Sequence, residues 1–356
     1  MDSNQPVDEV QDKEGVLYVG IDLGTSRTAV AASNGVRESV ASYVGYPKDM
    51  VARKALKKEV LFGDEALERR LMLNLYRPLE KGVIKFSDTD GRSDEAEGNM
   101  RAATDLVKQA VALAKPKSDE LVYAVIGCPA ECSMLNKKAI LDAARDGVDS
   151  ALVVSEPFAV AYGLDRLYDT LVIDIGAGTT DLCRMHGTLP ADEDQITLDV
   201  AGDAIDEALW TNLEAACQGA QFTVHKIREI KERYAYVGDT RDPIEVELPV
   251  NGKPTKFFIE DPVRDACRTI IPPMVDALGQ LVSSFDPDFQ SHLKRNVLLG
   301  GGGSQIVGLG EALEREMKKS LGEGRVSTVE EPVYAGANGA LKTAHDMPPE
   351  YWEQLK

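Results

Sequence analysis

The sequence predicts an α/β protein built from two similar lobes that share a cleft. Strand-like and helix-like segments alternate along the chain, which is typical of α/β folds. One unusual strand–turn–strand pattern occurs twice, over residues 16–32 and 170–185, and the two copies are about 150 residues apart. Repetition at this separation predicts a duplicated fold. No Pro-, Gly- or Ser-rich linker divides the chain, so we expect two lobes around a common cleft rather than separate domains joined by a linker.

In the first half of the chain, apolar β-branched runs predict strands, and apolar residues at helical spacing predict helices. Strands are expected over residues 16–21, 28–32, 121–127 and 152–155. One helix is expected over residues 103–114, where Leu106, Ala110 and Leu113 fall on one face. A second is expected over residues 134–145, with Gly147 as its stop.

The second half continues the alternation. Pro157 suits the first position of a helix that Glu156 opens. Strands are expected over residues 170–173 and 181–185. A further strand enters a glycine-rich turn at residues 300–304, and helices follow over residues 311–319 and 335–345.

The amino-acid composition limits the classes of partner that this protein can bind. Of its 356 residues, 43% are hydrophobic and 28% charged, which excludes a disordered chain and suits two ordinary domains. The formal net charge is −19, so the chain as a whole has no electrostatic reason to bind nucleic acid or an anionic membrane. We expect neither as a partner.

The acidic start, residues 1–15, has no apolar run behind basic residues, and no segment reaches the roughly 18 to 20 apolar residues of a membrane span. We therefore expect a flexible leader and a cytoplasmic protein. The five scattered cysteines are typical of reduced thiols. Cys128 and Cys132 lie four residues apart and could share a helix face as metal ligands. No second cysteine pair or nearby histidine completes such a site, so buried thiols are the better interpretation.

Three glycine-containing turns follow predicted strands, at residues 22–26 (DLGTS), 174–180 (DIGAGTT) and 300–304 (GGGGS). Glycine permits close backbone approach, so successive N–H groups can point at phosphate oxygens, and Thr and Ser hydroxyls add donors. Asp22 and Asp174 stand at strand ends, where a carboxylate can hold Mg²⁺ through water. A single such turn is equally consistent with a plain hairpin. Three such turns in this order along the chain favour phosphate binding.

Two other phosphate-binding systems are missing from the sequence. It contains no GxxxxGK[ST] motif, which excludes a P-loop enzyme. No GxGxxG opens a helix after the first strand, so a dinucleotide fold has little support.

The three turns, with Ser-Glu-Pro at residues 155–157, resemble the ordered motif set of the actin/Hsp70/sugar-kinase ATPase superfamily. Three further segments are more similar to actins than to chaperones: residues 62–66 (FGDEA), 77–84 (RPLEKGVI) and 227–232 (IREIKE). Residues 45–49 (GYPKD) and 348–352 (PPEYW) resemble the magnetosome type of bacterial actin. This resemblance, which covers nearly the whole chain, implies an actin-like two-lobed fold with duplicated RNase H-like domains around an ATP cleft.

The resemblance also implies a division of the chain. The first lobe would span residues 16–156, with a small subdomain at about 36–79, and the second residues 157–331, with a small subdomain at about 202–285. Residues 332–356 would return to the first lobe.

By the same resemblance, the two aspartate-led turns would grip the phosphates of ATP through Gly24, Thr25 and Ser26 and through Gly176, Ala177, Gly178 and Thr179. Base and ribose would meet a second set, namely Gly202, Asp203, Arg228, Lys231, Glu232, Gly301, Gly302 and Ser304. Read without the resemblance, the charged residues of this set are ordinary exposed helix charges. Mg²⁺ and its water shell would be organised by Asp22, Glu156 and Asp174.

Hydrolysis requires a water molecule in line with the γ-phosphate. Glu156 matches the glutamate that bacterial actins use near that water, although a first-turn helix acid is also favoured by the helix dipole. Asp174 and Asp142 are the other catalytic candidates, and Asp142 would ordinarily be a solvated surface acid. One residue departs from the actin pattern. Eukaryotic actins have a phosphate-contacting lysine seven residues after the first aspartate, and this position is Ala29 here. Arg27 could supply the missing positive charge.

The function implied is an ATPase that uses ATP/ADP and Mg²⁺ and assembles head to tail into homopolymeric cytoplasmic filaments. The magnetosome likeness implies a role in organising magnetosomes through adaptor proteins, alongside the magnetosome chain. Rod-shape and plasmid-segregation actins share this chemistry and stay open as alternatives. A chaperone would need a substrate domain after the nucleotide fold, and a sugar kinase an aspartate aimed at a sugar hydroxyl. We place neither in this sequence, and we expect no direct membrane insertion.

Overall fold

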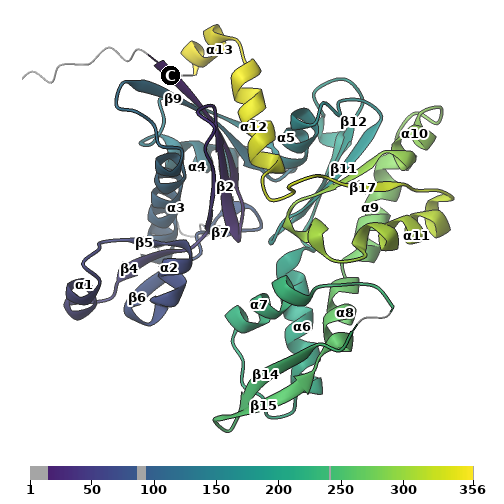
Figure 1. Cartoon of the computed structure of the whole chain (residues 1–356). Coiled ribbons are helices and arrows are strands. Elements are labelled where there is room, and N and C mark those ends of the chain that lie inside the picture. The colour runs from purple at the N-terminus through teal and green to yellow at the C-terminus, as the bar shows by residue number, and fades with distance from the viewer. Residues whose placement is uncertain (1–14, 86–93, 240–241, 356) are drawn as a thin grey trace, which may run out of the picture.

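The structure, a computed structural model, describes residues 15–85, 94–239 and 242–355. The predicted leader, apart from its last residue, lies outside the described residues. The described chain forms two five-stranded sheets, each accompanied by helices (Figure 1), so the α/β prediction is confirmed.

Both sheets have the same topology. The first has the strand order β10-β9-β1-β2-β3, with bounds Ser150–Ser155, Glu120–Cys128, Gly15–Leu23, Arg27–Ala32 and Arg37–Ala41. The second has the order β17-β16-β11-β12-β13, with bounds Val326–Thr328, Val297–Gly300, Thr170–Ile175, Thr180–Met185 and Gln195–Leu198. In each, three antiparallel strands form a meander, and two later strands extend the sheet in parallel on the other side of the first strand. The predicted duplication is confirmed.

Strand register brings the motif residues to matching sheet edges. Asp22 at the end of β1 pairs with Gly127 of β9, and Asp174 at the end of β11 pairs with Gly300 of β16. Because parallel strands end at the same edge, the turns that follow them meet there, as ligand sites of α/β sheets commonly do.

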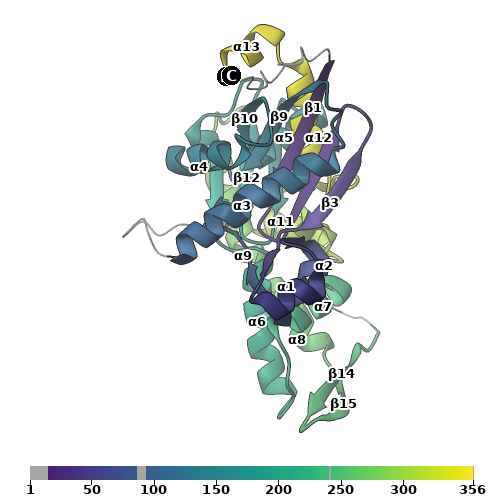
Figure 2. The ribbon, with the colours of Figure 1, turned by 90° about the vertical axis from the view of Figure 1, so that its left-hand side faces the viewer.

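Helices cover the first sheet on both faces. Helices α3 (Asp94–Leu113) and α4 (Met134–Ala144) pack together on one face, whereas α12 (Ala335–Asp346) lies against the other (Figures 1 and 2). Helix α12 also crosses α5 (Glu156–Gly163) at very short range, because a Cβ atom on Gly339 would stand 1.7 Å from the carbonyl oxygen of Ala159. Glycine is the residue that permits this crossing.

Two smaller units extend from the sheets toward one end of the molecule in Figure 1. The first contains a three-stranded sheet and short helices: β4 (Val44–Pro47), α1 (Met50–Leu56), β5 (Leu61–Phe62), α2 (Gly63–Glu68), the 3-10 helix η1 (Arg70–Met72) and β6 (Leu73–Tyr76), followed by the hairpin of β7 (Leu79–Glu80) and β8 (Val83–Ile84). The second contains α6 (Gly202–Ala216), α7 (Val224–Tyr234), the hairpin of β14 (Glu245–Val250) and β15 (Lys253–Phe258), and α8 (Glu260–Arg268). The lobe and subdomain boundaries given above stay predictions.

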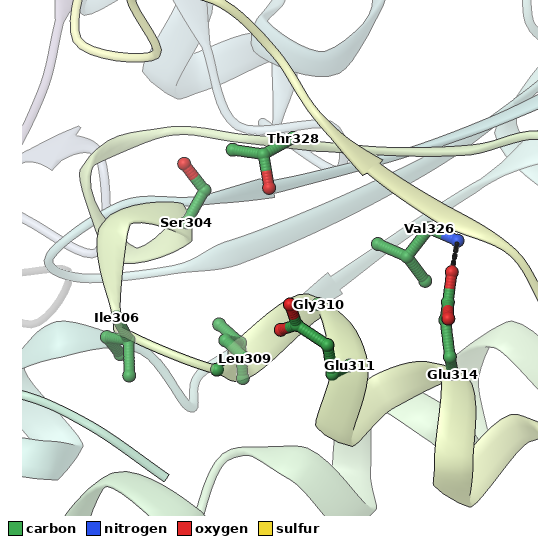
Figure 3. A pocket seen from close by; sticks show the side chains of 9 residues that line it. Ser304, Ile306, Leu309, Gly310, Glu311, Glu314, Val326 and Thr328 are labelled. Carbon is green, nitrogen blue, oxygen red and sulfur yellow. Dashed lines mark hydrogen bonds between the residues drawn. The ribbon is translucent and has the colours of Figure 1, made fainter. Parts of the chain in front are cut away.

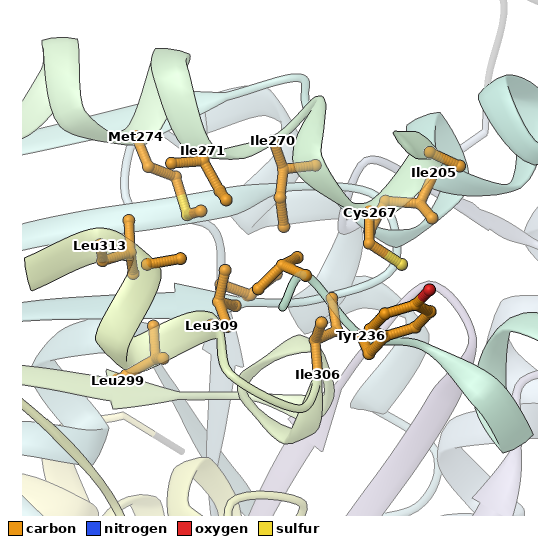
Figure 4. Close-up of a cluster of buried hydrophobic side chains, with 14 of the residues drawn as sticks. Ile205, Tyr236, Cys267, Ile270, Ile271, Met274, Leu299, Ile306, Leu309 and Leu313 are labelled. Atoms are coloured by element: carbon orange, nitrogen blue, oxygen red, sulfur yellow. The ribbon is translucent and has the colours of Figure 1, made fainter. Parts of the chain in front are cut away.

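The two sheets have separate hydrophobic cores. One core packs α3 and α4 against β1 and β9. The other joins α9 (Ile271–Ser283) and α11 (Leu309–Leu321) to the second sheet, with Met274, Leu309 and Leu313 close together in Figure 4. Helix α10 (Gln290–Arg295) and the 3-10 helices η2 (Asp192–Asp194) and η3 (Gly302–Gln305) complete the second lobe.

Several elements differ from prediction, and two of the differences have a clear physical reason. Helix α3 begins at Asp94 rather than at residue 103, because its polar first turns carry acids that suit a helix N-terminus but show no apolar spacing. Helix α13 (Pro349–Gln354) was not predicted. It buries Trp352, whose ring stacks on Tyr123 with centroids 4.9 Å apart. No helix in the described ranges is both long and apolar enough to cross a membrane.

Candidate active site

The three glycine turns meet around one cavity of about 560 Å³. The first turn joins β1 to β2, the second joins β11 to β12, and the third follows β16. The predicted site residues that line this cavity are Asp22, Gly24, Thr25, Ser26, Glu156, Asp174, Gly176, Ala177, Gly178, Thr179, Gly202, Lys231, Glu232, Gly301 and Gly302. Segments up to almost 300 residues apart in sequence therefore contribute to one site.

Four predicted residues do not line this cavity, and three of them lie close to it. Asp203 forms an ion pair with Arg77 at 2.9 Å, and Arg228 donates a hydrogen bond to the hydroxyl of Tyr43. Ser304 donates to the carbonyl oxygen of Gly301 at 2.7 Å and lines a neighbouring cavity of about 360 Å³ beside α11 (Figure 3).

The fourth, Asp142, lies away from the site on α4. Its side chain is 42% exposed and pairs with Arg145 at 2.9 Å. The face of α4 that packs into the protein carries Ala139, Ile140 and Ala143 instead. The structure therefore does not bring this candidate to the cavity, because the rotation of α4 turns it toward solvent.

Two turn glycines are required by close contacts. Gly301 has a φ of 72°, and a Cβ atom there would stand 2.2 Å from Oδ1 of Asp174. A Cβ atom on Gly178 would stand 2.7 Å from the backbone nitrogen of Lys81 and from the hydroxyl of Thr25. Real Cβ atoms do not approach other atoms so closely, so these turns take their shape from the absence of a side chain.

Four carboxyl groups, those of Asp22, Glu156, Asp174 and Asp181, lie close together beside the turns. Burial raises the pKa of Glu156 well above its usual range, and repulsion from Asp22, Asp181 and Asp174 raises it further. Burial, and then Asp22 and Asp181, raise the pKa of Asp174 in the same way. Oε1 of Glu156 is buried and has no hydrogen-bond partner. Such a concentration of buried negative charge is unfavourable without a cation or a proton.

These groups suit a hydrated cation better than a directly bound one. Among the described residues, no three His, Cys, Asp or Glu side chains are grouped closely enough to hold a metal ion themselves. The carboxyl groups of Asp22, Asp174 and Glu156 nevertheless all face one cavity and lack a compensating charge. Oxygen ligands reached through water are what Mg²⁺ prefers, because it keeps much of its hydration shell.

Asp181 belongs to this cluster, but the sequence reasoning did not select it as a site residue. It lies opposite Asp174 in the register of β11 and β12 and is 1% exposed. Its Oδ1 accepts hydrogen bonds from the backbone N–H of Ala130, at 2.8 Å, and from the hydroxyl of Thr197, at 2.6 Å. The sequence DIGAGTTD already contains the information needed to predict this position. In a hairpin over this segment, the first and last aspartates lie opposite each other on the two strands.

The turn between β7 and β8 lies in the segment 77–84 that resembles actins, but it was not predicted to be part of the site. Both of its residues have positive φ, 49° at Lys81 and 68° at Gly82. The N–H of Gly82 donates to the hydroxyl of Thr25 at 2.7 Å, and Nζ of Lys81 pairs with Asp199 at 2.6 Å. This turn therefore stands between the two phosphate-binding turns and links the lobes.

The pH dependence of stability tests whether Asp22 is part of a buried carboxyl cluster. Its buried setting raises the pKa from 3.8 to about 6, so between these values the folded state binds more protons than the unfolded state, and stability falls as pH rises. We expect Asp22→Asn to raise the stability of the metal- and nucleotide-free protein at pH 7.5 by about 2 to 3 kcal/mol. The gain should largely vanish near pH 4. Thermal unfolding in a chelating buffer measures it, and equal gains at both pH values would contradict this account.

A family model described as MreB/Mbl protein matches residues 17–349 of the chain. The chain belongs to the MreB/Mbl family. The predicted actin-like fold is confirmed.

Among MreB/Mbl relatives, the chain is 39% identical to the actin-like protein MamK of Paramagnetospirillum magneticum, over 95% of each chain. It is similar to a solved MamK double helical filament, with a TM-score of 0.88 and 38% identity over 94% of this chain and 100% of that chain. A non-polymerising MamK mutant bound to AMPPNP gives a TM-score of 0.69 at 38% identity, over 93% of this chain and 99% of that chain. The resemblance to magnetosome-type actins is thereby confirmed.

Proposed function

We propose that this MreB/Mbl-family chain binds ATP with Mg²⁺ in the cavity between its lobes, hydrolyses it slowly, and assembles into homopolymeric filaments that organise magnetosomes. The observation that carries the proposal is the meeting of three glycine turns around one cavity over an uncompensated carboxyl cluster. Similarity to the MamK filament and to the AMPPNP-bound MamK structure supports it.

The phosphates would lie between the two aspartate-led turns. The turns at Gly24 to Ser26 and at Gly176 to Thr179 line the cavity, and the N–H of Gly176 already donates to the carbonyl oxygen of Thr179 at 2.9 Å, which leaves the N–H groups of Ala177 to Thr179 for the phosphates on that side. The base and ribose would lie between Gly301–Gly302 and α7, where Nζ of Lys231 is held by the carbonyl oxygen of Gly202 at 2.7 Å. Asp203, Arg228 and Ser304 would act indirectly, by holding the walls of the cavity.

Glu156 would position and deprotonate the attacking water. It lines the cavity at the first turn of α5, and its unpartnered Oε1 is free to accept a proton. Burial and the neighbouring aspartates raise its pKa, so its carboxylate accepts a proton more readily than that of an exposed glutamate. Mg²⁺, held through water by Asp22 and Asp174, would neutralise charge on the phosphate oxygens. Asp181 would position the backbone of Ala130 rather than contact the nucleotide.

The first experiment is high-speed pelleting of the purified chain with Mg-ATP and without nucleotide, together with phosphate release. We expect ATP-dependent pelleting and slow release of phosphate. Protein that stays in the supernatant with ATP at all concentrations would overturn the filament proposal and leave a monomeric ATPase. Addition of candidate magnetosome-associated proteins to the pelleting assay then tests the adaptor role.

One exposed patch supports contact between copies. Three large apolar side chains, Met50, Val51 and Leu71, are 83%, 72% and 86% exposed at the tip of the first small unit. Nζ of Lys48 donates to the carbonyl oxygen of Leu71, which joins the two parts of the patch. Lysines and arginines outnumber acids among the exposed residues of the segment 48–72, in a chain whose net charge is −19, so the patch complements the acidic surface of a second copy.

We therefore expect Leu71→Asp to raise the critical concentration for pelleting at least about tenfold, because it removes a large apolar side chain that assembly would bury and adds a repelling charge. ATP binding should be unchanged. Leu135, which is 58% exposed on α4, provides the matched control as Leu135→Asp. Equal inhibition by both substitutions would show that the tip patch is not specific.

A further inference from the structure

One arginine joins the first glycine turn, residues 22–26, to the second lobe. Arg77 lies between β6 and β7, and its Nε donates to the carbonyl oxygen of Thr25 at 3.0 Å. Its two terminal nitrogens lie 3.0 and 2.9 Å from the two carboxylate oxygens of Asp203, at the start of α6. A bidentate contact of this kind fixes both the distance and the orientation of the two groups. A single guanidinium group therefore connects the two sides of the cavity.

Thr25 is held from two directions by the same segment of chain. Its carbonyl oxygen accepts the hydrogen bond from Arg77, and its hydroxyl accepts one from the N–H of Gly82 at 2.7 Å. Thr25 is 3% exposed, so these contacts form in a largely water-free setting. Residues 77–82 therefore fix both the backbone and the side chain of this turn residue.

Asp203 is in turn bound to the second glycine turn, residues 174–180. The N–H of Asp203 donates to the carbonyl oxygen of Ala177 at 2.7 Å, and the N–H of Gly202 donates to that of Gly176 at 3.2 Å. The backbone of Asp203 thus contacts the second turn while its carboxylate contacts Arg77. An unbroken series of contacts runs from Thr25 through Arg77 and Asp203 to Ala177, from one glycine turn to the other.

The setting of this ion pair distinguishes it from ordinary surface pairs. The side chains of Arg77 and Asp203 are 20% and 31% exposed, and neither residue lines the cavity. Exposed ion pairs contribute little to stability, but bidentate and partly buried ones contribute more. A second contact between the lobes meets the same carboxylate, because Arg228 donates to the hydroxyl of Tyr43 and lies 3.5 Å from Asp203. Asp203 is therefore a junction of two cationic side chains.

We propose that Arg77 is a positioning residue that holds the two glycine turns at the spacing that retains a bound nucleotide, without contacting the nucleotide itself. Release requires the turns to separate, and separation breaks the contacts of Arg77 with Thr25 and Asp203 together. Arg77 therefore slows dissociation more than it affects association. The effect on retention rests on the proposed nucleotide site. A lysine cannot replace Arg77, because one ammonium group cannot reach the carbonyl oxygen and both carboxylate oxygens at once.

The test measures binding and release of a fluorescent ATP analogue with Mg²⁺ by stopped flow on the full-length chain. We expect Arg77→Lys to raise the dissociation rate about tenfold and to leave the association rate within about twofold. Arg264→Lys is the matched control, because Arg264 is 21% exposed and pairs with Asp261 and Asp265, close to it in sequence, at 2.7 and 2.9 Å. Both rates should stay within about twofold there. An unchanged dissociation rate in a folded Arg77→Lys protein would overturn the proposal.

A double-mutant cycle tests whether Arg77 acts through Asp203. Arg77→Ala and Asp203→Ala should each speed dissociation, and the double variant should release the nucleotide no faster than the faster single variant, because all three break the same contact. Rate factors that multiply in the double variant would show that the two residues act separately, and would contradict the proposed series of contacts.

Hydrogen exchange of the nucleotide-free protein separates this proposal from the proposed function. We expect Arg77→Lys to speed amide exchange in peptides that cover residues 22–26 and 202–206, and Arg264→Lys to leave both unchanged. Equal exchange in the unaltered chain and in Arg77→Lys would overturn the role of Arg77 in joining the turns. An unaltered chain that binds no nucleotide would instead contradict the proposed function, while the exchange pattern would still decide whether Arg77 holds the turns together.

Discussion

Glu156→Gln is expected to lower phosphate release by roughly 10²- to 10⁴-fold while leaving ATP binding nearly intact. The substitution keeps the size and hydrogen-bonding reach of the side chain but removes the proton acceptor whose Oε1 is unpartnered in the cavity. Because bound ATP would persist, filaments should form and then remain, rather than disassemble as phosphate is released. Single-turnover phosphate release and time-resolved pelleting measure the two effects.

Asp142→Asn is the matched control for this prediction. Asp142 is another acid proposed from sequence, but it is exposed and paired with Arg145 on α4. We expect its replacement to leave phosphate release within about twofold of the unaltered chain, as for surface substitutions generally. A larger loss in Asp142→Asn than in Glu156→Gln would reverse the assignment of the water-positioning role.

Gly178→Val is expected to lower the affinity for Mg-ATP by at least about 100-fold. The first added carbon would stand 2.7 Å from backbone atoms of Lys81 and from the hydroxyl of Thr25, neither of which can move without separating the phosphate turns. Loss of two charge-assisted hydrogen bonds, at about 1.5 to 3 kcal/mol each, accounts for that factor. Titration with a fluorescent ATP analogue measures the affinity.

Gly238→Val provides the control for Gly178→Val, because a Cβ atom on Gly238 meets nothing within 4 Å. Both variants should keep cooperative thermal unfolding. Full nucleotide affinity in a folded Gly178→Val protein would show that the phosphates do not lie between these two turns.

The local motifs were predictable from sequence because their chemistry resides in the backbone. The turns at residues 22–26, 174–180 and 300–304 depend on glycine spacing and on the strands that precede them, both of which are visible along the chain. The duplication was predictable for the same reason, and the two sheets share one topology. Helix α13 was missed because its stability comes from burial of one tryptophan against β9 rather than from a periodic pattern.

Which charged side chains reach the cavity was decided by tertiary structure. Glu156 and Asp142 are both helix acids in sequence, yet the packing of α5 turns one into the cavity and the rotation of α4 turns the other to solvent. Asp181 joins the cluster only through its register with Asp174. Sequence by itself thus determined the fold class and the phosphate-binding turns, because both follow from local spacing. The placement of charges depends on contacts between segments far apart in the chain, which only the folded structure supplies.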